Sequence, residues 1–395
     1  MTLAIVGASY LQRPLVEKAR ELGIRTICFA WENGAVCKDI CDVFYPISIV
    51  EKERILCVCR AENIDGICTI ASDIAAPTVA YVAEKMRLVG NPYSVAVCAN
   101  NKYLMRQAFV AAGILCPRFA CVKSVEECSS FSWIKNSFIS QSGRIGIIVK
   151  PLDRSGSLAV TKVVCEEELL SAVKQALDVS FEHKAMIEEF VDGREISVEF
   201  ISYEGKHYPL QITDKVTTES PNFVELEHHQ PAILSANMYK KIYAITDKAL
   251  TALGVTCGAS HAEYKITKDG EIVVIEIGAR MGGDFIGSDL VRLSTGYDFV
   301  RGVIEVALGI FDVSRWNTQC LAYNHQYSGV YFLSKETENL LPIFEHWKDY
   351  PEIIACERTD SLLRNVTCSA DRSGYFIYQG KTKFNVNRFK LECDK

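Results

Sequence analysis

Short apolar runs alternate with segments of helical periodicity over residues 1–95. Strands that alternate with helices at this spacing predict a parallel sheet covered by helices on both faces. The first turn, Gly7-Ala-Ser9, lacks the GxGxxG pattern of dinucleotide-binding turns, so it gives no specific support for a nicotinamide-dependent oxidoreductase. The predicted strands here are 3–6, 25–30, 64–70 and 87–89, and the predicted helices are 11–22, 51–62 and 73–85.

The pattern changes to a mixture of helices and alternating strands over residues 96–310. In the stretch 195–202, for example, apolar Ile196, Val198 and Phe200 alternate with polar neighbours, which predicts a strand. Residues 311–395 hold short strand-like runs at 329–333 and 374–378 and carry no motif that indicates a function. Further helices are predicted at 102–112, 124–135, 166–177 and 238–253, and further strands at 118–122, 146–150, 158–164, 185–191, 259–266 and 271–277.

Composition and charge narrow the class of protein. With 49% apolar and 23% charged residues, the chain has the balance of a folded, soluble protein. Its formal net charge of -6 gives no electrostatic basis for binding nucleic acid or an anionic membrane. The first residues lack the basic segment of a signal peptide, and no apolar run approaches the ~18 residues of a spanning helix. We therefore expect a cytoplasmic protein whose 16 cysteines, which form no CxxC pair, are reduced core thiols.

The segment Lys268-Asp-Gly-Glu271 predicts a tight turn between two strands. An Asp-Gly pair between apolar runs favours a two-residue type I′ turn, because both central residues of that turn need positive φ. Such a turn would place Glu263 directly opposite Glu276, and His261 opposite Gly278. A bulge in this hairpin would break the predicted register.

Two glutamates at opposed positions repel each other, and Glu276 lies within the apolar run Ile272-Val-Val-Ile-Glu-Ile277, which looks buried on both sides. Such a pair needs a cation nearby, and Mg²⁺ commonly takes one or two carboxylates together with substrate phosphates. We therefore predict a Mg²⁺ site at Glu263 and Glu276, with Mn²⁺ as an alternative ion. The competing interpretation is a solvated Glu263 and a Glu276 that bonds the backbone or Lys265.

A lysine at a strand end followed by a loop of small residues is typical of phosphate-binding segments. Lys150 precedes Pro151 and the loop Asp153-Arg-Ser-Gly-Ser157, whose backbone N–H groups can fold over phosphates, although an ordinary hairpin loop looks the same. Together with other motifs in the same order, this segment resembles the ATP-grasp superfamily, and within it the carboxylate–amine ligases. The motifs are Asn101-Lys102-xxx-Arg106, Val149-Lys-Pro151, Glu188-Glu-Phe-Val-x-Gly193, Glu195, Glu263 and Glu276-Ile-Gly-Ala-Arg280.

The resemblance implies a fold class and a division of the chain. The expected fold is α/β and α+β, with a Rossmann-like domain at 1–95 followed by an ATP-grasp domain at 96–310. A lid subdomain is expected at about 117–187, and a small β-rich domain at 311–395. A homodimer formed through the N-terminal domain is a further expectation of the resemblance.

The resemblance also implies a role for each motif residue. Lysines would contact the ATP phosphates, a loop would cover them, and a carboxylate and two backbone groups would read adenine. A further carboxylate would hold the ribose, two glutamates would bind Mg²⁺, and an arginine would stabilise the transferred phosphoryl group. In that order, the residues are Lys102 and Lys150; Asp153, Ser155, Gly156 and Ser157; Glu188, with the backbone of Glu189 and Val191; Glu195; Glu263 and Glu276; and Arg280.

Two positions depart from the common pattern of the family. Many members carry asparagine two residues after the second metal glutamate, where this chain has Gly278. A second metal ion would then depend on water, Asp284 or Asp289. His261 stands where some relatives have arginine, so it would either bind a phosphate or oxyanion or fill the space above Gly278.

The segments 214–218 and 223–231 resemble the substrate region of amino-acid and dipeptide ligases. The implied reaction activates a small carboxylate as an acyl phosphate, which an amine then attacks to form an amide. Arg280, His261 and Lys215 are the predicted catalytic residues. The predicted substrate residues are Glu225, His228, Gly282 and Gly283, although His228 and its neighbour His229 equally fit a solvated loop.

Two other functions remain open from the sequence. One is activation of bicarbonate or carbamate, as in carboxylases and carbamoyl-phosphate synthases, although no biotinylation motif or second synthetase half is present. The other is a nucleotide-binding protein without turnover, which the asparagine missing at Gly278 keeps open. The expected partners are small-molecule carboxylates and amines, without nucleic acid or membrane.

Overall fold

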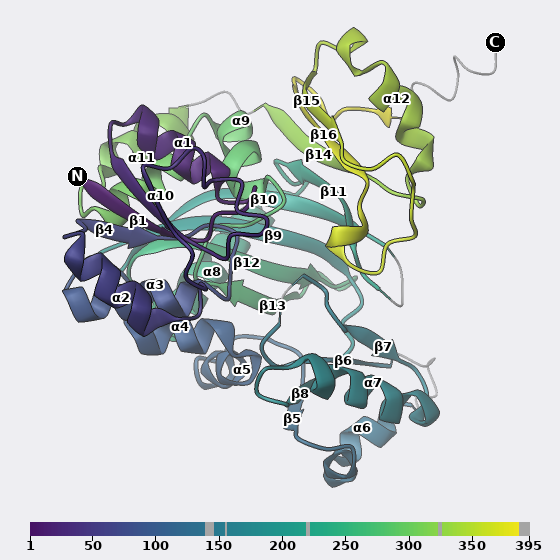
Figure 1. Ribbon diagram of the computed structural model, residues 1–395. Helices are drawn as coiled ribbons and strands as arrows, with labels where there is room; N and C mark the ends of the chain where they lie inside the picture. The colour runs from purple at the N-terminus through teal and green to yellow at the C-terminus, as the bar shows by residue number, and fades with distance from the viewer. Residues whose placement is uncertain (139–145, 155, 219–221, 323–325, 387–395) are drawn as a thin grey trace.

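The computed structural model describes residues 1–138, 146–154, 156–218, 222–322 and 326–386. Its N-terminal part is a four-stranded parallel sheet with the order β3-β2-β1-β4 (Figure 1). The predicted strand at 87–89 is wrong, because Arg87 adopts a left-handed φ of 56° and ends the preceding helix. The elements are β1 (Thr2–Val6), α1 (Arg13–Glu21), β2 (Arg25–Phe29), β3 (Val43–Tyr45), α2 (Lys52–Ala61), β4 (Gly66–Cys68) and α3 (Ala76–Met86).

An eight-stranded antiparallel sheet, here called the central sheet, follows with the order β13-β12-β9-β10-β11-β14-β16-β15. Its apolar face carries Ile196, Val198 and Phe200 of β9, and these side chains pack with Phe109 and Leu250 of the covering helices. The opposite face is polar and carries the site described below. The elements are α4 (Tyr93–Asn100), α5 (Lys102–Ala111), β9 (Arg194–Tyr203), β10 (Lys206–Thr217), β11 (Glu225–Gln230), α8 (Ala236–Leu253), β12 (Gly258–Ile266) and β13 (Ile272–Gly278).

A smaller antiparallel sheet, the lid sheet, has the order β5-β8-β6-β7 and lies at the lower right of Figure 1. Its core joins Val149 and Ile187 of the strands to Val173 and Ala176 of the covering helix. Its strands lie within or next to the predicted lid at about 117–187. The elements are β5 (Phe119–Val122), α6 (Ser132–Asn136), β6 (Ile147–Pro151), β7 (Thr161–Val163), α7 (Glu166–Val179) and β8 (Ala185–Glu189).

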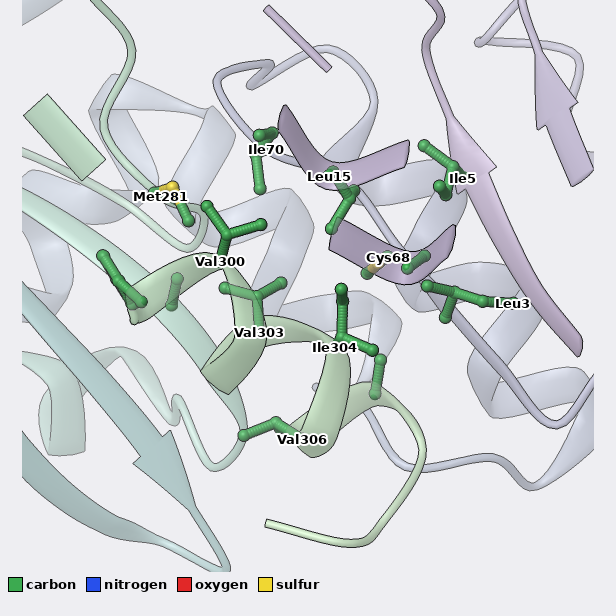
Figure 2. Packing of buried hydrophobic residues seen from close by; sticks show 14 of the residues in the cluster. Leu3, Ile5, Leu15, Cys68, Ile70, Met281, Val300, Val303, Ile304 and Val306 are labelled. Atoms are coloured by element: carbon green, nitrogen blue, oxygen red, sulfur yellow. The ribbon is translucent and has the colours of Figure 1, made fainter. Parts of the chain in front are cut away.

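Helix α10 (Phe299–Ala307) joins the N-terminal sheet to the central sheet. Nearly all of its residues are buried, because it contacts α1 and β4 on one side and β9 and β12 on the other. Figure 2 shows Val303 and Ile304 of α10 close to Leu3 and Cys68 of the N-terminal sheet. Most of its residues are apolar, and such a helix is stable when neighbouring elements cover it in this way. The short helices α9 (Val291–Thr295) and α11 (Val313–Ala322) flank it.

The C-terminal strands extend the central sheet. Strand β14 (Tyr327–Leu333) pairs with β11 on one side and with β16 (Gly374–Gly380) on the other, and β15 (Ile353–Arg358) forms the edge. These strands and α12 (Leu341–Glu345) share an aromatic core of their own. The division of the chain at residue 310 stays a prediction, and the hydrogen bonding of the sheet continues across it.

The predicted pairing in the β12–β13 hairpin is confirmed where it matters for the site. Glu263 lies opposite Glu276, and His261 lies opposite Gly278. The predicted two-residue turn is wrong, because Ile266 pairs with Ile272. The Thr267 N–H bonds the Glu271 carbonyl at 3.0 Å, which continues the pairing and leaves a three-residue loop at 268–270.

A bulge explains why the register is correct in spite of the longer loop. The pairing shifts between Glu263 and Tyr264, which leaves Ile275 of β13 as the extra residue. The longer loop displaces the register by one residue, and the bulge displaces it back. The shift from the longer loop and the shift from the bulge therefore cancel, and Glu263 and Glu276 lie opposite each other as predicted.

Two global features complete the fold. Within the described ranges, no helix is both long and apolar enough to cross a membrane. Cys28, Cys37 and Cys68 lie in the core between the N-terminal sheet and α10. Burial raises the pKa of Cys68 to about 12, so this thiol stays protonated at neutral pH.

Candidate functional site

A cavity of about 200 Å³ lies between the lid sheet and the polar face of the central sheet. Strands β6 and β8 supply one wall, and β12 and β13 supply the other. Most of the predicted site residues lie in its lining, whereas Ser155 lies outside the described residues. The predicted residues that line it are Lys102, Lys150, Gly156, Ser157, Glu188, Glu189, Val191, Glu195, Glu225, His261, Glu263, Glu276 and Arg280.

Glu263 and Glu276 project into this cavity side by side. Their side chains are 25% and 26% exposed, so the predicted burial of Glu276 on both sides is wrong. Lys215 Nζ lies 2.6 Å from Glu263 Oε1, and Lys102 Nζ lies 3.2 Å from Glu276 Oε1. The alternative in which Lys265 neutralises Glu276 is wrong, since Lys265 pairs with Glu195 at 2.8 Å.

The two carboxylates fit a divalent cation. Burial acts to raise the pKa of Glu263, but Lys215 and His261 hold it well below the usual value, so the group is ionised. The described residues include no group of three candidate ligands from His, Cys, Asp and Glu. Mg²⁺ needs no such group, because substrate phosphates and water usually complete its shell. Asp284 does not join the pair, since it is bound by Arg372 at 2.9 Å.

A buried ion-pair cluster forms the wall on the lid side. The Glu188 carboxylate forms ion pairs with Lys150 Nζ at 2.7 Å and with a guanidinium nitrogen of Arg106 at 2.8 Å. Burial acts to raise the pKa of Glu188, but these two cations lower it. The carboxylate predicted to read adenine is therefore already bound by two cations, whereas Glu189 and Val191 also line the cavity.

The predicted phosphate-covering loop is anchored at its start. The Asp153 carboxylate accepts hydrogen bonds from the Phe181 N–H at 3.0 Å and the Glu182 N–H at 2.8 Å, and it lies outside the cavity lining. The next residue, Arg154, accepts a bond from Lys102 Nζ at 2.6 Å through its carbonyl. Gly156 has a φ of 69°, a conformation that favours glycine, so the sequence suits the bend of this loop.

Lys215 lies beneath the cavity and joins three carboxylates. Its ammonium is 2.6 Å from Glu263, 3.2 Å from Glu195 and 3.3 Å from Glu225. Burial acts to lower the pKa of Lys215, but the three glutamates raise it well above its usual value. The ammonium therefore fixes three cavity carboxylates in place, and its predicted catalytic role stays a prediction.

Glu199 was missed by the sequence reasoning and supports His261 from behind. Its carboxylate is fully buried and bonds His261 Nδ1, and its other oxygen accepts the Gly282 N–H at 3.0 Å. Burial acts to lower the pKa of His261, but Glu199 and Glu263 raise it to about 9. The alternation in β9 was the available signal, because it places Glu199 on the same face as Glu195.

Asp73 was also missed, and it holds Arg280. Its two carboxylate oxygens each accept a hydrogen bond from the Arg280 guanidinium at 2.7 Å. Asp73 follows β4, at the carboxyl edge of the N-terminal sheet, where ligand-binding loops gather in parallel sheets. The pair fixes the direction in which Arg280 faces the cavity.

The other predicted substrate residues lie beside the cavity rather than in its lining. Gly282 and Gly283 line a recess of about 20 Å³ together with Tyr10 and Asp284. His228 is buried in β11, and its Nε2 lies 3.9 Å from Asp284. The alternative of a solvated loop at His228 and His229 is therefore wrong.

The geometry matches a family of known proteins. Residues 144–289, which include the lid strands β6, β7 and β8 as well as Glu263 and Glu276, match the ATP-grasp domain. This stretch of the chain is therefore similar to ATP-grasp domains.

Several curated proteins similar to this chain are named as amino-acid ligases. Alanine–anticapsin ligase of Bacillus subtilis (strain 168) is 29% identical over 255 residues, which cover 58% of this chain and 51% of that protein. D-alanine–D-alanine ligase of Geobacter sulfurreducens is 24% identical over 205 residues, which cover 50% and 61%. The chain thus spans about half the length of the first of these curated relatives. The predicted resemblance to the carboxylate–amine ligase branch is confirmed.

The fold class is confirmed by solved structures. The L-amino acid ligase of Bacillus licheniformis superposes with a TM-score of 0.80 at 22% identity, over 100% of this chain and 96% of that one. The superposition extends through the N-terminal sheet, the ATP-grasp region and the C-terminal strands. At this low sequence identity, the superposition supports only the shared architecture.

Proposed function

We propose that this protein is an ATP-dependent carboxylate–amine ligase that releases ADP. It activates an amino acid or another small carboxylate as an acyl phosphate and joins it to an amine. The observation that carries the proposal is the pair Glu263 and Glu276, which lines one cavity together with Lys102, Lys150 and Arg280. Carboxylates for a metal ion, cations for phosphates and a fixed guanidinium are the parts that phosphoryl transfer requires.

The residues would act mainly through position and charge. Glu263 and Glu276 would hold Mg²⁺, which supplies charge neutralisation at the ATP phosphates when it is bound. Lys102 and Lys150 present ammonium groups at the cavity wall, where they would bind phosphate oxygens. Arg280, held by Asp73, would donate hydrogen bonds to the acyl phosphate as negative charge shifts onto it.

A panel assay for ADP tests the proposal. The wild-type chain should release ADP with Mg²⁺ and a mixture of amino acids, and mass spectrometry should detect a new amide. Glu276→Gln should lower turnover at least about 100-fold, because it removes a charged metal ligand. Glu271→Gln is the matched control, since Glu271 is exposed in the same hairpin and should keep wild-type turnover.

Other outcomes would identify the two alternative functions. ADP release stimulated by bicarbonate alone would replace the proposal with bicarbonate activation. Tight ATP binding without ADP release across broad carboxylate and amine panels would indicate a nucleotide-binding protein without turnover. Wild-type rates in Glu276→Gln would contradict the metal assignment.

A further inference from the structure

The two carboxylates of the metal site have counter-cations of different kinds. Glu263 is held by Lys215, whose side chain is 3% exposed and also contacts two further carboxylates. Glu276 is held by Lys102, which lines the cavity itself. Among the residues that the structure describes, Lys102 is the one ion-pair partner of Glu276. The first counter-cation is therefore shared and fixed, whereas the second is paired singly and borders the cavity.

Lys102 has further contacts that keep it in place when one partner changes. Its Nζ donates a hydrogen bond to the Arg154 carbonyl at 2.6 Å and lies 3.2 Å from Glu276 Oε1. Its backbone N–H bonds the Leu152 carbonyl at 3.3 Å. Because an ammonium group has three donors, Lys102 can keep the bond to Arg154 while it exchanges the carboxylate for a phosphate oxygen. The exchange needs only a pivot of the side chain at the start of the predicted phosphate-covering loop.

The ion pair between Lys102 and Glu276 opposes the binding of either ligand alone. A cation that binds Glu276 competes with the Lys102 ammonium, and a phosphate that binds Lys102 competes with the Glu276 carboxylate. The two side chains are only 7% and 26% exposed, so salt and water screen this competition less than they do at the protein surface. When a metal ion and a phosphate bind together, both members of the pair again face an opposite charge.

We propose that Lys102 couples the binding of the metal ion to that of the nucleotide, by exchanging Glu276 for a phosphate oxygen. Each ligand alone binds weakly, because it breaks the ion pair and leaves one member without a counter-charge. The two together bind tightly, and such coupling acts equally in both directions. This inference rests on the proposed function, since it describes how the same site is loaded.

Manganese binding in the absence of nucleotide tests the first half of the inference. Mn²⁺ is titrated into the full chain, and electron paramagnetic resonance measures the free ion. Lys102→Met should bind Mn²⁺ at least about fivefold more tightly than the wild type, because Glu276 has lost its competing cation. A lysine that only supports the structure would instead lower the metal affinity when it is replaced.

Lys265→Met is the matched control for the manganese titration. Lys265 lines the same cavity, but it pairs with Glu195 at 2.8 Å rather than with a metal-site carboxylate. Its loss removes the same charge from the cavity and should change the Mn²⁺ affinity by less than about twofold. The comparison therefore separates the ion pair at Glu276 from the general field of the cavity.

ADP binding in the presence of a chelator tests the second half. Glu276→Gln should bind metal-free ADP at least about fivefold more tightly than the wild type, because Lys102 is then free for the phosphates. Glu225→Gln is the matched control, since Glu225 lines the same cavity and pairs with Lys215. It should change the affinity for metal-free ADP by less than about twofold.

The outcomes separate this inference from the proposed function. An unchanged or lower Mn²⁺ affinity in a folded Lys102→Met, or an equal gain in Lys265→Met, would overturn it. If Lys102→Met does not fold, the ADP titration decides, and an unchanged affinity in Glu276→Gln or an equal gain in Glu225→Gln would overturn it. Both expected gains without ADP release on any substrate panel would contradict only the ligase. Amide formation with ADP release, but without these gains, would contradict only the coupling.

Discussion

Gly282 has no side chain, and this leaves room for the Glu199 carboxylate to bond both His261 and the Gly282 N–H. A Cβ at this position would lie 2.7 Å from Glu199 Oε1 and 2.7 Å from His261 Nδ1, closer than real Cβ contacts. We expect Gly282→Ala to push these two groups apart and to lower ADP release at least about tenfold, because small misplacements at a catalytic site are costly. Steady-state kinetics on the purified variant would measure the effect.

The adjacent glycine provides the control for this prediction. A Cβ at Gly283 would meet only the Ala71 side chain, at an ordinary contact distance of 3.5 Å. Gly283→Ala should therefore keep turnover within about twofold of the wild type. If both variants lose activity equally, the segment needs flexibility rather than space at Gly282.

At the scale of single residues, the sequence indicated which residues lie near the site better than it indicated which groups bond them. Glu188 and Asp153 were predicted to bind the nucleotide. In the structure Glu188 pairs with two cationic side chains, and Asp153 accepts hydrogen bonds from two backbone amides. Motif spacing places such residues near the site. It does not indicate which groups neutralise them, since those partners come from other parts of the chain.

At the scale of elements, the β12–β13 hairpin shows what local rules can predict. The alternation and the Asp-Gly turn were enough to oppose Glu263 and Glu276. They could not predict the bulge at Ile275, where the structure also shows a tertiary contact. The Ile275 carbonyl accepts a hydrogen bond from the buried Arg106 side chain of α5, far away in the sequence.

A histidine in strand β11, which joins the C-terminal strands to the rest of the sheet, predicts how the stability of the fold depends on pH. His229 bonds Tyr378 Oη at 3.0 Å and Glu227 at 2.7 Å. Burial lowers the pKa of His229 below its ordinary value of 6.5, although Glu227 acts in the opposite direction. As the pH falls below 6.5, the unfolded chain takes up a proton that the folded chain does not, so stability falls.

Urea unfolding at pH 7.5 and at pH 5.5 would measure this effect. The free energy of unfolding should be lower at pH 5.5, with up to about 1.4 kcal/mol per pH unit from this histidine. His229→Gln should reduce the difference between the two pH values, whereas His346→Gln, at an exposed site, should leave it unchanged. An unchanged difference in His229→Gln would show that other groups cause the pH dependence.

At the scale of the whole molecule, the site depends on contacts between segments that are distant in the sequence. Arg280 is held by Asp73 of the N-terminal sheet, and Asp284 is held by Arg372 of the C-terminal segment. Neither pair has a signature in spacing or periodicity, because each forms only when separate sheets are packed together. The sequence therefore singled out most of the residues that line the cavity, and it missed the residues that the two ends of the chain contribute.

The Asp73–Arg280 pair gives a test of how the N-terminal sheet supports the site. Its side chains are only 12% and 15% exposed, so Asp73→Asn would leave a largely desolvated guanidinium without its counter-charge. We expect a loss of about 3 kcal/mol in the free energy of unfolding, as for broken buried ion pairs, together with slower ADP release. Urea unfolding and steady-state kinetics on the same sample would measure both effects.

A second ion pair across the same interface is the matched comparison. Lys18 of α1 lies 3.1 Å from Asp298, and these side chains are 25% and 24% exposed. Because water screens this pair, Lys18→Gln should cost less than about 1 kcal/mol and leave ADP release unchanged. If the two variants lose the same stability and Asp73→Asn keeps full turnover, the Asp73 carboxylate joins the two sheets without orienting Arg280.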